Sequence, residues 1–584
     1  MKVIGRTGEN SQFFASLAMV VVTIVVSGVL DSAYWHHNFL LVNLFVAVAV
    51  LQNMLLSDAG QVSFGQGAIF GLAAYTVGIV TAVNGQPLWM GFAVGIVFAV
   101  LLGLAYALPS LRVQGYYLGF VSLSAAVVFP ELLVAFDAVT KGINGITITP
   151  TAITVPFAGK LMPLSLLIMA FVCAVIFLHR RLRASVIGRR MRVASVSPEA
   201  AQTLGIGPGH MRFFAFLMAA LGTGVAGVLY TPLLGFVSPY AFRVELSMYF
   251  FFAVIVGGSG RVLGPVVGAW LLYLIPNVLL VDLADYRLLG YGIAALFIML
   301  VFPDGVVGSL ERFIRSRRPP APTATISIAA AKTIVALPQS EIAHADMSPS
   351  IEVRGATKRF GNVAALNAID LTIARGAIHG IVGPNGSGKT TLLNAFSGLI
   401  RLDSGTIRIH GQDIGRLPPH RIPALGVART FQTPRIFDDL SIWDNVTMGA
   451  ESGHGATAAN PVLTALEPVR TQWQALSSNA LQHAQRRLLE VLRASAMQGD
   501  IVLLDEPAAG LAPDERNELA GMLILLRERL GKTVVLIEHD LSLVWRVADR
   551  ISVLDAGVLV AEGAPAAIRS DPRVRALFTG ERDA

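Results

Sequence analysis

GPNGSGKTT, residues 383 to 391, decides how the second half of this 584-residue chain folds. It fits the pattern G-x-x-x-x-G-K-[ST], which forms a phosphate-binding loop when a strand precedes it and a helix follows. Both conditions hold, because the apolar run IHGIV ends at Val382 and the helical run TTLLNAFSGL begins at Thr390. Glycines let backbone N–H groups point at phosphate oxygens, and the helix N-terminus adds a positive dipole end. The stretch therefore predicts a nucleotide site on an α/β domain.

The residues of this loop are candidate contacts for ATP. Lys389 would reach the β- and γ-phosphates, and the Thr390 hydroxyl would ligate Mg²⁺. The residues that we expect to bind ATP within the loop are Gly383, Asn385, Gly386, Ser387, Gly388, Lys389, Thr390 and Thr391.

A second apolar run, IVLLDEP at residues 501–507, predicts a buried strand that ends in two carboxylates. Asp505 is placed to hold Mg²⁺. Glu506 is placed to orient or deprotonate the attacking water, as a general base does. His539 follows the later strand TVVLI and is placed to contact the γ-phosphate. In this order the residues predict ATP hydrolysis, with Glu506 and His539 as catalytic candidates and Asp505 and Thr390 as metal ligands.

The composition divides the chain into an apolar part and an ordinary part. Hydrophobic residues make up 54% of the sequence and charged residues only 14%. Soluble domains usually carry about 25% charged residues, so part of this chain is not in water. The net charge of +7 suggests nucleic acid as a partner, but the arginines cluster beside apolar runs, at residues 180–192 and 312–318. That placement is typical of the cytoplasmic loops of a membrane protein, so we expect no nucleic acid.

About ten apolar segments have roughly the length of a membrane-crossing helix. They are residues 13–31, 38–57, 62–83, 89–109, 115–136, 161–178, 212–235, 245–257, 263–282 and 287–303. With an even number of spans, both chain ends and the basic loops fall on one side, which the positive-inside rule makes the cytoplasm. The eighth segment is short enough to be re-entrant. The first resembles a signal peptide without a cleavage site, so we expect it to be retained as a span.

Two features of the apolar half allow more than one interpretation. Gly222–Gly227 reads GxGxxG, which binds dinucleotides only within a βαβ unit. Because it lies inside an apolar span, close packing of helices is the better interpretation. Glu131 falls within the fifth segment, where an ionisable group indicates a functional site. A position near a helix end, beside Pro130, is the equally simple alternative.

A stretch rich in Pro, Ala and Ser separates the two halves, at residues 317–350. It has no sustained helical or strand period and is typical of a tether. We therefore predict a polytopic α-helical membrane domain at residues 1–316, with about ten spans, and a linker at 317–350. Residues 351–584 are predicted to form an α/β P-loop domain.

The motifs of the second half resemble those of the ATP-binding cassette (ABC) family. GPNGSGKTT, Gln432 in ARTFQTPRIF, LLDEPAAGL and His539 in IEHD resemble its Walker A, Q-loop, Walker B and H-loop. The resemblance implies that Gln432 contacts the nucleotide and its Mg²⁺, and that Phe360 in KRFGN stacks on adenine. It covers essentially all of residues 351–584. DEPAAGL and RTFQ resemble the ATPases of branched-chain amino acid importers in particular.

The first half resembles the permease subunit that accompanies such ATPases, over residues 37–303. The resemblance rests on LSDAGQVSFGQGAIFGLAAY, SPEAAQTLGIGPGHMRFFAF, LGFVSP and VGGSGRVLGPVVGAWLL. It implies that the loop with PEAAQTLGI, residues 198–206, contacts the ATPase in the cytoplasm. Two subunits that are usually separate would then be joined by the linker.

The ABC signature, close to LSGGQ, is altered in this chain. At its expected position stands Leu481-Gln-His-Ala-Gln485, with Gln482 in place of the serine and Ala484 in place of the second glycine. In the family the signature completes the ATP site of the opposite subunit, and Ala484 adds a Cβ where close backbone approach is needed. Two interpretations follow: a heteromeric transporter with one weak ATP site, or a variant with full activity.

Together the two halves resemble an ATP-driven importer of branched-chain amino acids or related small polar solutes. The resemblance implies a bacterial inner-membrane protein with a cytoplasmic ATPase domain, and ATP and Mg²⁺ as cofactors. The implied partners are a second permease subunit, a second ATP-binding subunit and a periplasmic solute-binding protein. The alternatives are an exporter half-transporter, a membrane-anchored ATPase without transport, and an importer of urea, amides or aromatic acids. Exporters of that type carry long cytoplasmic extensions, whereas most loops here are short.

Overall fold

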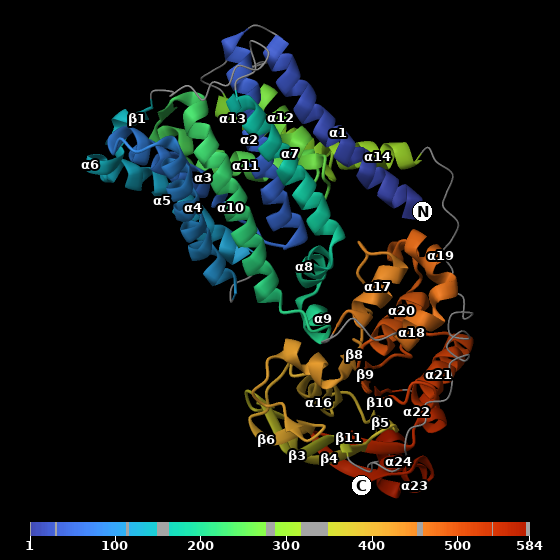
Figure 1. The fold of residues 1–584 in the computed structure, drawn as a ribbon. Helices are drawn as coiled ribbons and strands as arrows, with labels where there is room; N and C mark the ends of the chain where they lie inside the picture. The colour runs from blue at the N-terminus through green and yellow to red at the C-terminus, as the bar shows by residue number, and fades with distance from the viewer. Residues whose placement is uncertain are drawn as a thin grey trace. The chain divides into compact units, whose positions relative to one another are not determined.

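The computed structural model describes residues 2–29, 32–111, 116–148, 163–275, 287–316, 349–452, 460–539 and 541–579. The chain divides into two compact units. Residues 5–196 and 208–320 form the unit that holds the apolar helices. Residues 1–4, 197–207 and 321–584 form the unit that holds the large sheets (Figure 1).

The first unit is a bundle of helices, coloured blue to green in Figure 1. The helices are α1 (Lys2–Val29), α2 (Ala33–Asn53), α3 (Gln66–Gly78), α4 (Leu88–Ser110), α5 (Tyr116–Ala135), α6 (Asp137–Thr140), α7 (Pro163–Ala184), α8 (Val186–Val196), α10 (Pro208–Leu234), α11 (Val244–Gly257), α12 (Gly264–Leu274), α13 (Arg287–Val301) and α14 (Gly305–Ser316). The short strands β1 (Ile146–Thr147) and β2 (Phe236–Val237) pair antiparallel.

Seven helices in the described part of the chain are long and apolar enough to cross a membrane. They are Tyr34–Asp58, Gln66–Val83, Leu88–Ser110, Tyr117–Ala135, Leu164–Ala184, Pro208–Leu234 and Pro239–Gly257. Two shorter apolar helices lie at Asn10–Val26 and Gly264–Leu274. With α13, every predicted span overlaps a helix, while the number of actual crossings stays a prediction.

The third predicted span begins later than the sequence suggested. After α2 the chain makes a π-helical turn, Met54–Asp58, and residues 59–65 then run without helix or strand. The helix α3 starts only at Gln66, and the π-helical turn Ile79–Val83 extends it. The predicted start at residue 62 is therefore wrong, because the apolar pattern does not distinguish an irregular segment enclosed by helices from the first turn of a helix.

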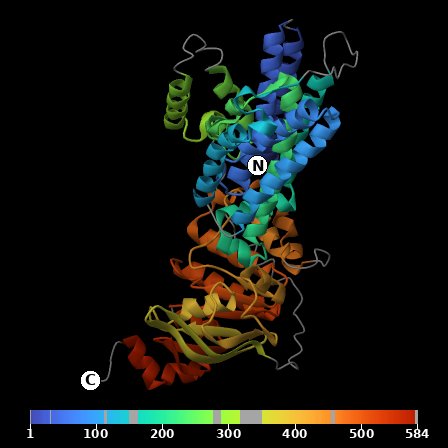
Figure 2. The same cartoon turned by 90° about the vertical axis from the view of Figure 1, so that its left-hand side faces the viewer.

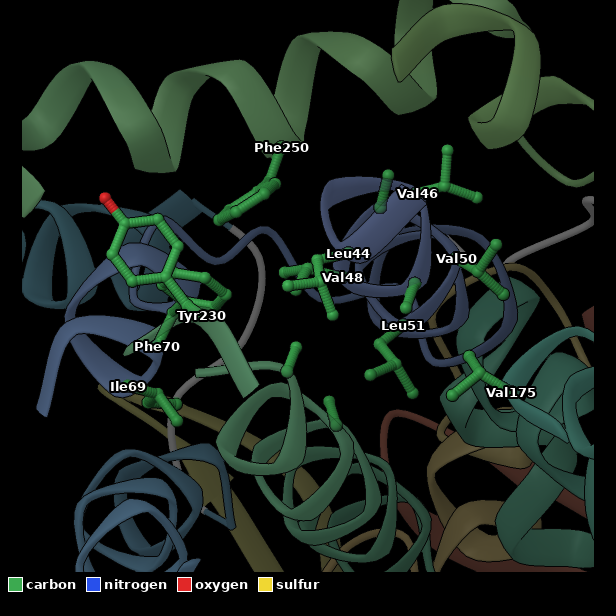
Figure 3. Close-up of a cluster of buried hydrophobic side chains, with 14 of the residues drawn as sticks. Leu44, Val46, Val48, Val50, Leu51, Ile69, Phe70, Val175, Tyr230 and Phe250 are labelled. Atoms are coloured by element: carbon green, nitrogen blue, oxygen red, sulfur yellow. The ribbon is translucent and has the colours of Figure 1, made fainter. Parts of the chain in front are cut away.

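The core of the bundle is built around α2. Residues 46–50 are fully buried on every side, as expected for an apolar helix enclosed by other helices. Figure 3 shows side chains from neighbouring helices around it, including Phe70 of α3, Val175 of α7, Tyr230 of α10 and Phe250 of α11.

Glycines bring α10 into close contact with its neighbours. A Cβ at Gly224 would lie 2.6 Å from Ala99 Cβ, and one at Gly227 would lie 2.3 Å from the Phe70 carbonyl oxygen. A Cβ at Gly222 would lie 2.5 Å from Leu51 Cδ1. The GxGxxG sequence therefore serves helix packing, which confirms that interpretation.

Glu131 lies on α5, and its side chain is exposed. It directly follows Pro130 within this helix, and the helix continues to Ala135. The position near a helix end is thus the interpretation that fits.

The second unit contains two sheets, shown from another side in Figure 2. The six-stranded sheet has the order β12-β11-β5-β10-β9-β8, with all neighbours parallel except β11 and β12. Its strands are β5 (Ile378–Val382), β8 (Val427–Arg429), β9 (Ile501–Asp505), β10 (Thr533–Ile537), β11 (Arg550–Asp555) and β12 (Val558–Gly563). The antiparallel sheet comprises β4 (Val363–Ala374), β3 (Pro349–Phe360), β6 (Ser404–Ile409) and β7 (Gln412–Asp413), in that order.

Helices accompany the parallel strands of this unit. They are α16 (Lys389–Phe396), α17 (Ile442–Ala450), α18 (Pro461–Ala465), α19 (Arg470–Ala475), α20 (His483–Ser495), α21 (Pro513–Glu528), α22 (Leu541–Val547), α23 (Pro565–Ser570) and α24 (Pro572–Thr579). The first strand begins at Pro349, slightly before the predicted domain boundary at Ile351. The rest of the predicted linker, residues 317–348, lies outside the described residues.

One segment from the middle of the apolar half belongs to the second unit. It is residues 197–207, with the short helix α9 (Pro198–Thr203). Glu199 Oε2 lies 3.9 Å from Arg435 Nη2 of the same unit. This is the loop that resembles the ATPase-contacting segment of the permeases.

Gly227 and Gly292 provide a test of the close packing of α10. Gly227→Ala puts a methyl group against the Phe70 carbonyl, and we expect it to destabilise the bundle by about 1 to 3 kcal/mol. Gly292→Ala on α13 meets no atom within 4 Å and serves as the matched control. The check is the melting temperature of the full chain in detergent, which should fall for the first variant alone. Equal melting temperatures would contradict the packing role.

Candidate functional site

The phosphate loop lies between β5 and α16, as its sequence predicts. β5 is buried at all five positions and pairs with β10 and β11. Gly388 has φ +100°, and a Cβ there would lie 2.3 Å from the Ala365 carbonyl oxygen. Only glycine fits this position, because it tolerates positive φ and needs no space for a side chain. Asn385 and Gly386, at the tip of the loop, are exposed.

Lys389 is the first residue of α16 and is 5% exposed. Its Nζ donates hydrogen bonds to the carbonyl oxygens of Gly383 and Pro384, both at 2.8 Å. The Ser387 hydroxyl lies 3.4 Å from the same nitrogen. Burial lowers the pKa of Lys389, while the nearby carboxylates Glu506 and Asp505 favour its charged form. The ammonium group is thus held inside the loop that would surround the phosphates.

Two predicted residues, Gln432 and His539, contact the carboxylate of a third, Glu506. Gln432 Nε2 donates to Glu506 Oε2 at 2.8 Å, and His539 Nε2 lies 2.6 Å from Glu506 Oε1. Glu506 itself has φ +47°, a conformation that is rare for a side-chain-bearing residue and common at functional sites. The structure therefore brings the two catalytic candidates and the Q-loop glutamine together around one carboxylate.

Asp505 provides the test of whether the site fits Mg²⁺. It ends β9 and is 2% exposed, and its Oδ1 has no hydrogen-bond partner among the described residues. Its Oδ2 lies 3.5 Å from Arg429 Nη2. Burial raises the pKa of Asp505, and Arg429 opposes that shift. A buried carboxylate oxygen without a partner fits a hard cation, for which oxygen ligands are preferred.

The other predicted ligands have different surroundings. Thr390 is exposed in the first turn of α16, and Thr391 behind it is half-buried. Gln432 is exposed, with its amide nitrogen bonded to Glu506. Phe360 ends β3 and its side chain is 51% exposed, which leaves a ring face open for stacking. Their roles toward ATP and Mg²⁺ stay predictions.

Two buried arginines at the site were not found from the sequence. Arg487 of α20 is 1% exposed and donates to the carbonyl oxygens of Phe431 at 2.6 Å and Gln432 at 2.5 Å. Arg429 of β8 lies beside Asp505. In α20, Arg487, Glu490 and Arg493 recur at three-residue spacing on a buried side of the helix. That spacing was the available signal, but charged residues at such intervals usually indicate an exposed face.

The altered signature lies at the start of α20. Gln482 is the N-cap residue and is exposed, and its backbone N–H donates to Gln485 Oε1 at 3.1 Å. The side chain of Gln485 is therefore used in capping the helix. Arg487 connects this same helix to the Q-loop, one turn further along.

The role of Arg487 in holding the Q-loop can be tested by substitution, with the neighbouring Arg486 as the control. Arg487→Met removes the donor to the buried Phe431 carbonyl and to the partly buried Gln432 carbonyl, each worth about 1 to 3 kcal/mol. Hydrogen exchange of the peptide covering residues 431–438 should therefore become roughly a hundredfold faster in the full chain. Arg486→Met removes a partly exposed ion pair with Asp438 and a long hydrogen bond of 3.3 Å to the Leu481 carbonyl oxygen, and it should leave the exchange nearly unchanged. Equal exchange in both variants would contradict the role of Arg487.

Comparison with known proteins identifies both halves. The family described as "Branched-chain amino acid transport system / permease component" matches residues 41–302, and the ABC transporter family matches residues 366–509. The ATP-binding protein BraF of Pseudomonas aeruginosa, for high-affinity branched-chain amino acid transport, is 36% identical over 252 residues. That alignment covers 40% of this chain and 98% of BraF.

A second relative agrees with this assignment. LivG of Escherichia coli, which has the same description as BraF, is 35% identical over 251 residues, covering 40% of this chain and 98% of LivG. A nucleotide-free ATP-binding cassette of known structure is 26% identical, with a TM-score of 0.36, and covers 40% of this chain and 99% of that cassette. The family matches and the two relatives show that the chain belongs to the ABC transporters, with a permease domain of the branched-chain amino acid type and an ABC ATPase domain in one polypeptide.

Proposed function

We propose that this chain imports branched-chain amino acids or related small polar solutes across a bacterial inner membrane, using ATP hydrolysed by its own second domain. The observation that carries the proposal is the fusion itself. A permease family match and a cassette with Glu506, Gln432 and His539 in contact occur in the same polypeptide. The names of BraF and LivG support branched-chain amino acids as the first substrates to test.

The substrate range is kept wide because the cassette does not select the solute. The sulfate/thiosulfate import ATP-binding protein CysA of Mycobacterium bovis is also 36% identical, over 229 residues and 64% of its length. Urea, amides and aromatic acids therefore remain in the proposed range. The direction of transport is supported by the name of CysA, which is described as an import ATP-binding protein.

The chemistry at the cassette follows from the groups around Glu506. Bound Mg²⁺ would offset phosphate charge, with Asp505 and Thr390 as its protein ligands. Lys389 would bind the β- and γ-phosphates, and the backbone N–H groups of the loop would bind their oxygens. Glu506 accepts a proton from the attacking water, and Gln432 and His539 hold that carboxylate in place. The segment 197–207 lies in the same unit and is the proposed connection to the permease.

The altered signature supports a heteromeric assembly with a second permease subunit, a second ATP-binding subunit and a periplasmic solute-binding protein. Neither Gln482 nor Ala484 offers the short hydroxyl or the glycine backbone of LSGGQ. The site built on Lys389 and Glu506 would then be completed by a partner's intact signature. The partner's own site would be the weak one.

Uptake by cells tests the proposed transport. Labelled leucine uptake should fall when the gene is deleted, return with the unaltered chain, and stay low with Lys389→Ala. The reason is that loss of the ammonium group weakens phosphate binding. Immunoblots of the membrane fraction control for the amount of each protein. Unchanged leucine uptake in the deletion strain would overturn leucine as the substrate, and urea, amides and aromatic acids would be tested in the same strains.

ATP hydrolysis by the purified chain tests the asymmetry. Without its partner subunits, the chain in detergent should hydrolyse ATP slowly, because two copies would face each other with altered signatures. Restoring Ser and Gly through Gln482→Ser and Ala484→Gly should raise the rate by about tenfold or more, the usual effect of regaining transition-state contacts. A normal transporter rate in the unaltered chain alone would contradict the heteromeric proposal.

A further inference from the structure

The break between α2 and α3 lies in the middle of the helix bundle. Thr223 Oγ1 donates a hydrogen bond of 2.6 Å to Gln66 Oε1, at the first residue of α3. Thr223 lies near the centre of α10, and its neighbour Gly224 packs against Ala99, the central residue of α4. The N-terminus of α3 is therefore at the depth of the middle of both helices. Non-helical backbone at such depth occurs where it is buried by protein or lines a path for polar solutes.

Hydroxyl groups from several helices gather at this N-terminus. Ser122 Oγ of α5 accepts from Phe64 N at 2.9 Å, and Ser247 Oγ of α11 accepts from Gly67 N at 3.1 Å. Ser63 Oγ accepts from Gly65 N at 3.2 Å. All three serines are at most 2% exposed. A polar cluster thus lies within a bundle whose other buried side chains are mainly apolar.

Two buried glutamine side chains in this cluster each have an amide atom without a partner. Gln52 Nε2 of α2 donates to the Ser63 carbonyl oxygen at 2.8 Å, three residues before the start of α3, and its Oε1 has no partner among the described residues. Gln66 uses its oxygen for Thr223, and its Nε2 has no partner in that same set of residues. Both side chains belong to residues that are 1% exposed. Buried amide atoms are nearly always hydrogen-bonded. Here an unpaired acceptor and an unpaired donor both belong to side chains that bond at one helix N-terminus, where a single bound ligand could pair with both.

We propose that this cluster, defined by Gln52, Ser63, Gln66 and Thr223 at the start of α3, holds the solute in the permease and that the solute is an α-amino acid. The positive end of the α3 dipole and the Gln66 amide nitrogen bind its carboxylate. The free oxygen of Gln52 accepts from its ammonium group. The side chains of the cluster carry no net charge, so they match a zwitterion without leaving an ion of their own unpaired. This inference rests on the proposed function and names the residues that contact its substrate.

Kinetics of uptake test the cluster. In cells where leucine uptake depends on Lys389, Gln52→Leu and Gln66→Leu should each raise KM by at least about tenfold, since a hydrogen bond to a charged group is lost. Asn43→Leu is the matched control, because Asn43 also lies on α2 with a buried, unpaired amide oxygen but bonds Thr23 and Phe39 instead. Unchanged KM in both glutamine variants, at normal membrane levels, would overturn the site.

Thiol labelling tests the same site without measuring transport. It also does not depend on whether Gln52→Leu and Gln66→Leu fold as the unaltered chain does. Cys173 is the only cysteine of the sequence, so Cys173→Ser gives a background without thiols. In that background Gln66→Cys should react with a small methanethiosulfonate reagent, and saturating leucine should slow the reaction several-fold by occupying the site. Asn43→Cys should show no leucine effect. A labelling rate at residue 66 that leucine does not change, or no labelling at all, would overturn the site.

The two experiments separate the inference from the proposed function. If deletion leaves leucine uptake unchanged while leucine protects the thiol at residue 66, the proposed transport of leucine fails and the binding site stands. If uptake depends on Lys389 but neither KM nor protection responds, the transport stands and the site fails.

Discussion

Backbone hydrogen bonding inside an apolar bundle is the constraint on which the rest of the membrane unit depends. No water is present there to pair with a free N–H or C=O group, so every departure from helix needs partners from the protein. The interruption at residues 59–65 meets this requirement through side chains, since serine hydroxyls accept from Phe64, Gly65 and Gly67. The glycines of α10 bring its backbone close enough to α3 and α4 for the surrounding helices to enclose the break. A polar interior position is thereby created in an otherwise apolar core.

The cassette depends on a comparable constraint at the phosphate loop. Gly388 must be glycine because of its positive φ and its contact with Ala365, and Glu506 is held at a positive φ that its side chain resists. Parallel strands bring Asp505, Glu506 and His539 to the same edge of the sheet, since β9 and β10 are neighbours in register. Arg487 then fixes the Q-loop to the helix that carries the altered signature.

Elements formed by consecutive residues could be predicted from the sequence. Contacts between segments that are distant in the sequence could not. The loop at Gly383–Thr391 and the strand ending at Asp505 could be predicted because a strand, a turn and a helix are consecutive in the chain. The start of α3 at Gln66 could not, because residues 59–65 form neither helix nor strand and a helical period is a weak signal over so few residues. Arg487 was missed because its partners lie about 55 residues away, at Phe431 and Gln432.

We propose that hydrolysis at Glu506 drives solute movement through the helices of the same chain. The most direct measurement uses proteoliposomes that contain the complete transporter, with ATP and labelled leucine, and compares the unaltered chain with Glu506→Gln. The substitution keeps the shape of the side chain and removes the proton acceptor. We predict that the variant binds ATP but neither hydrolyses it nor accumulates leucine. If the Glu506→Gln vesicles accumulated leucine at the rate of the unaltered chain, hydrolysis at Glu506 would not be what drives solute movement.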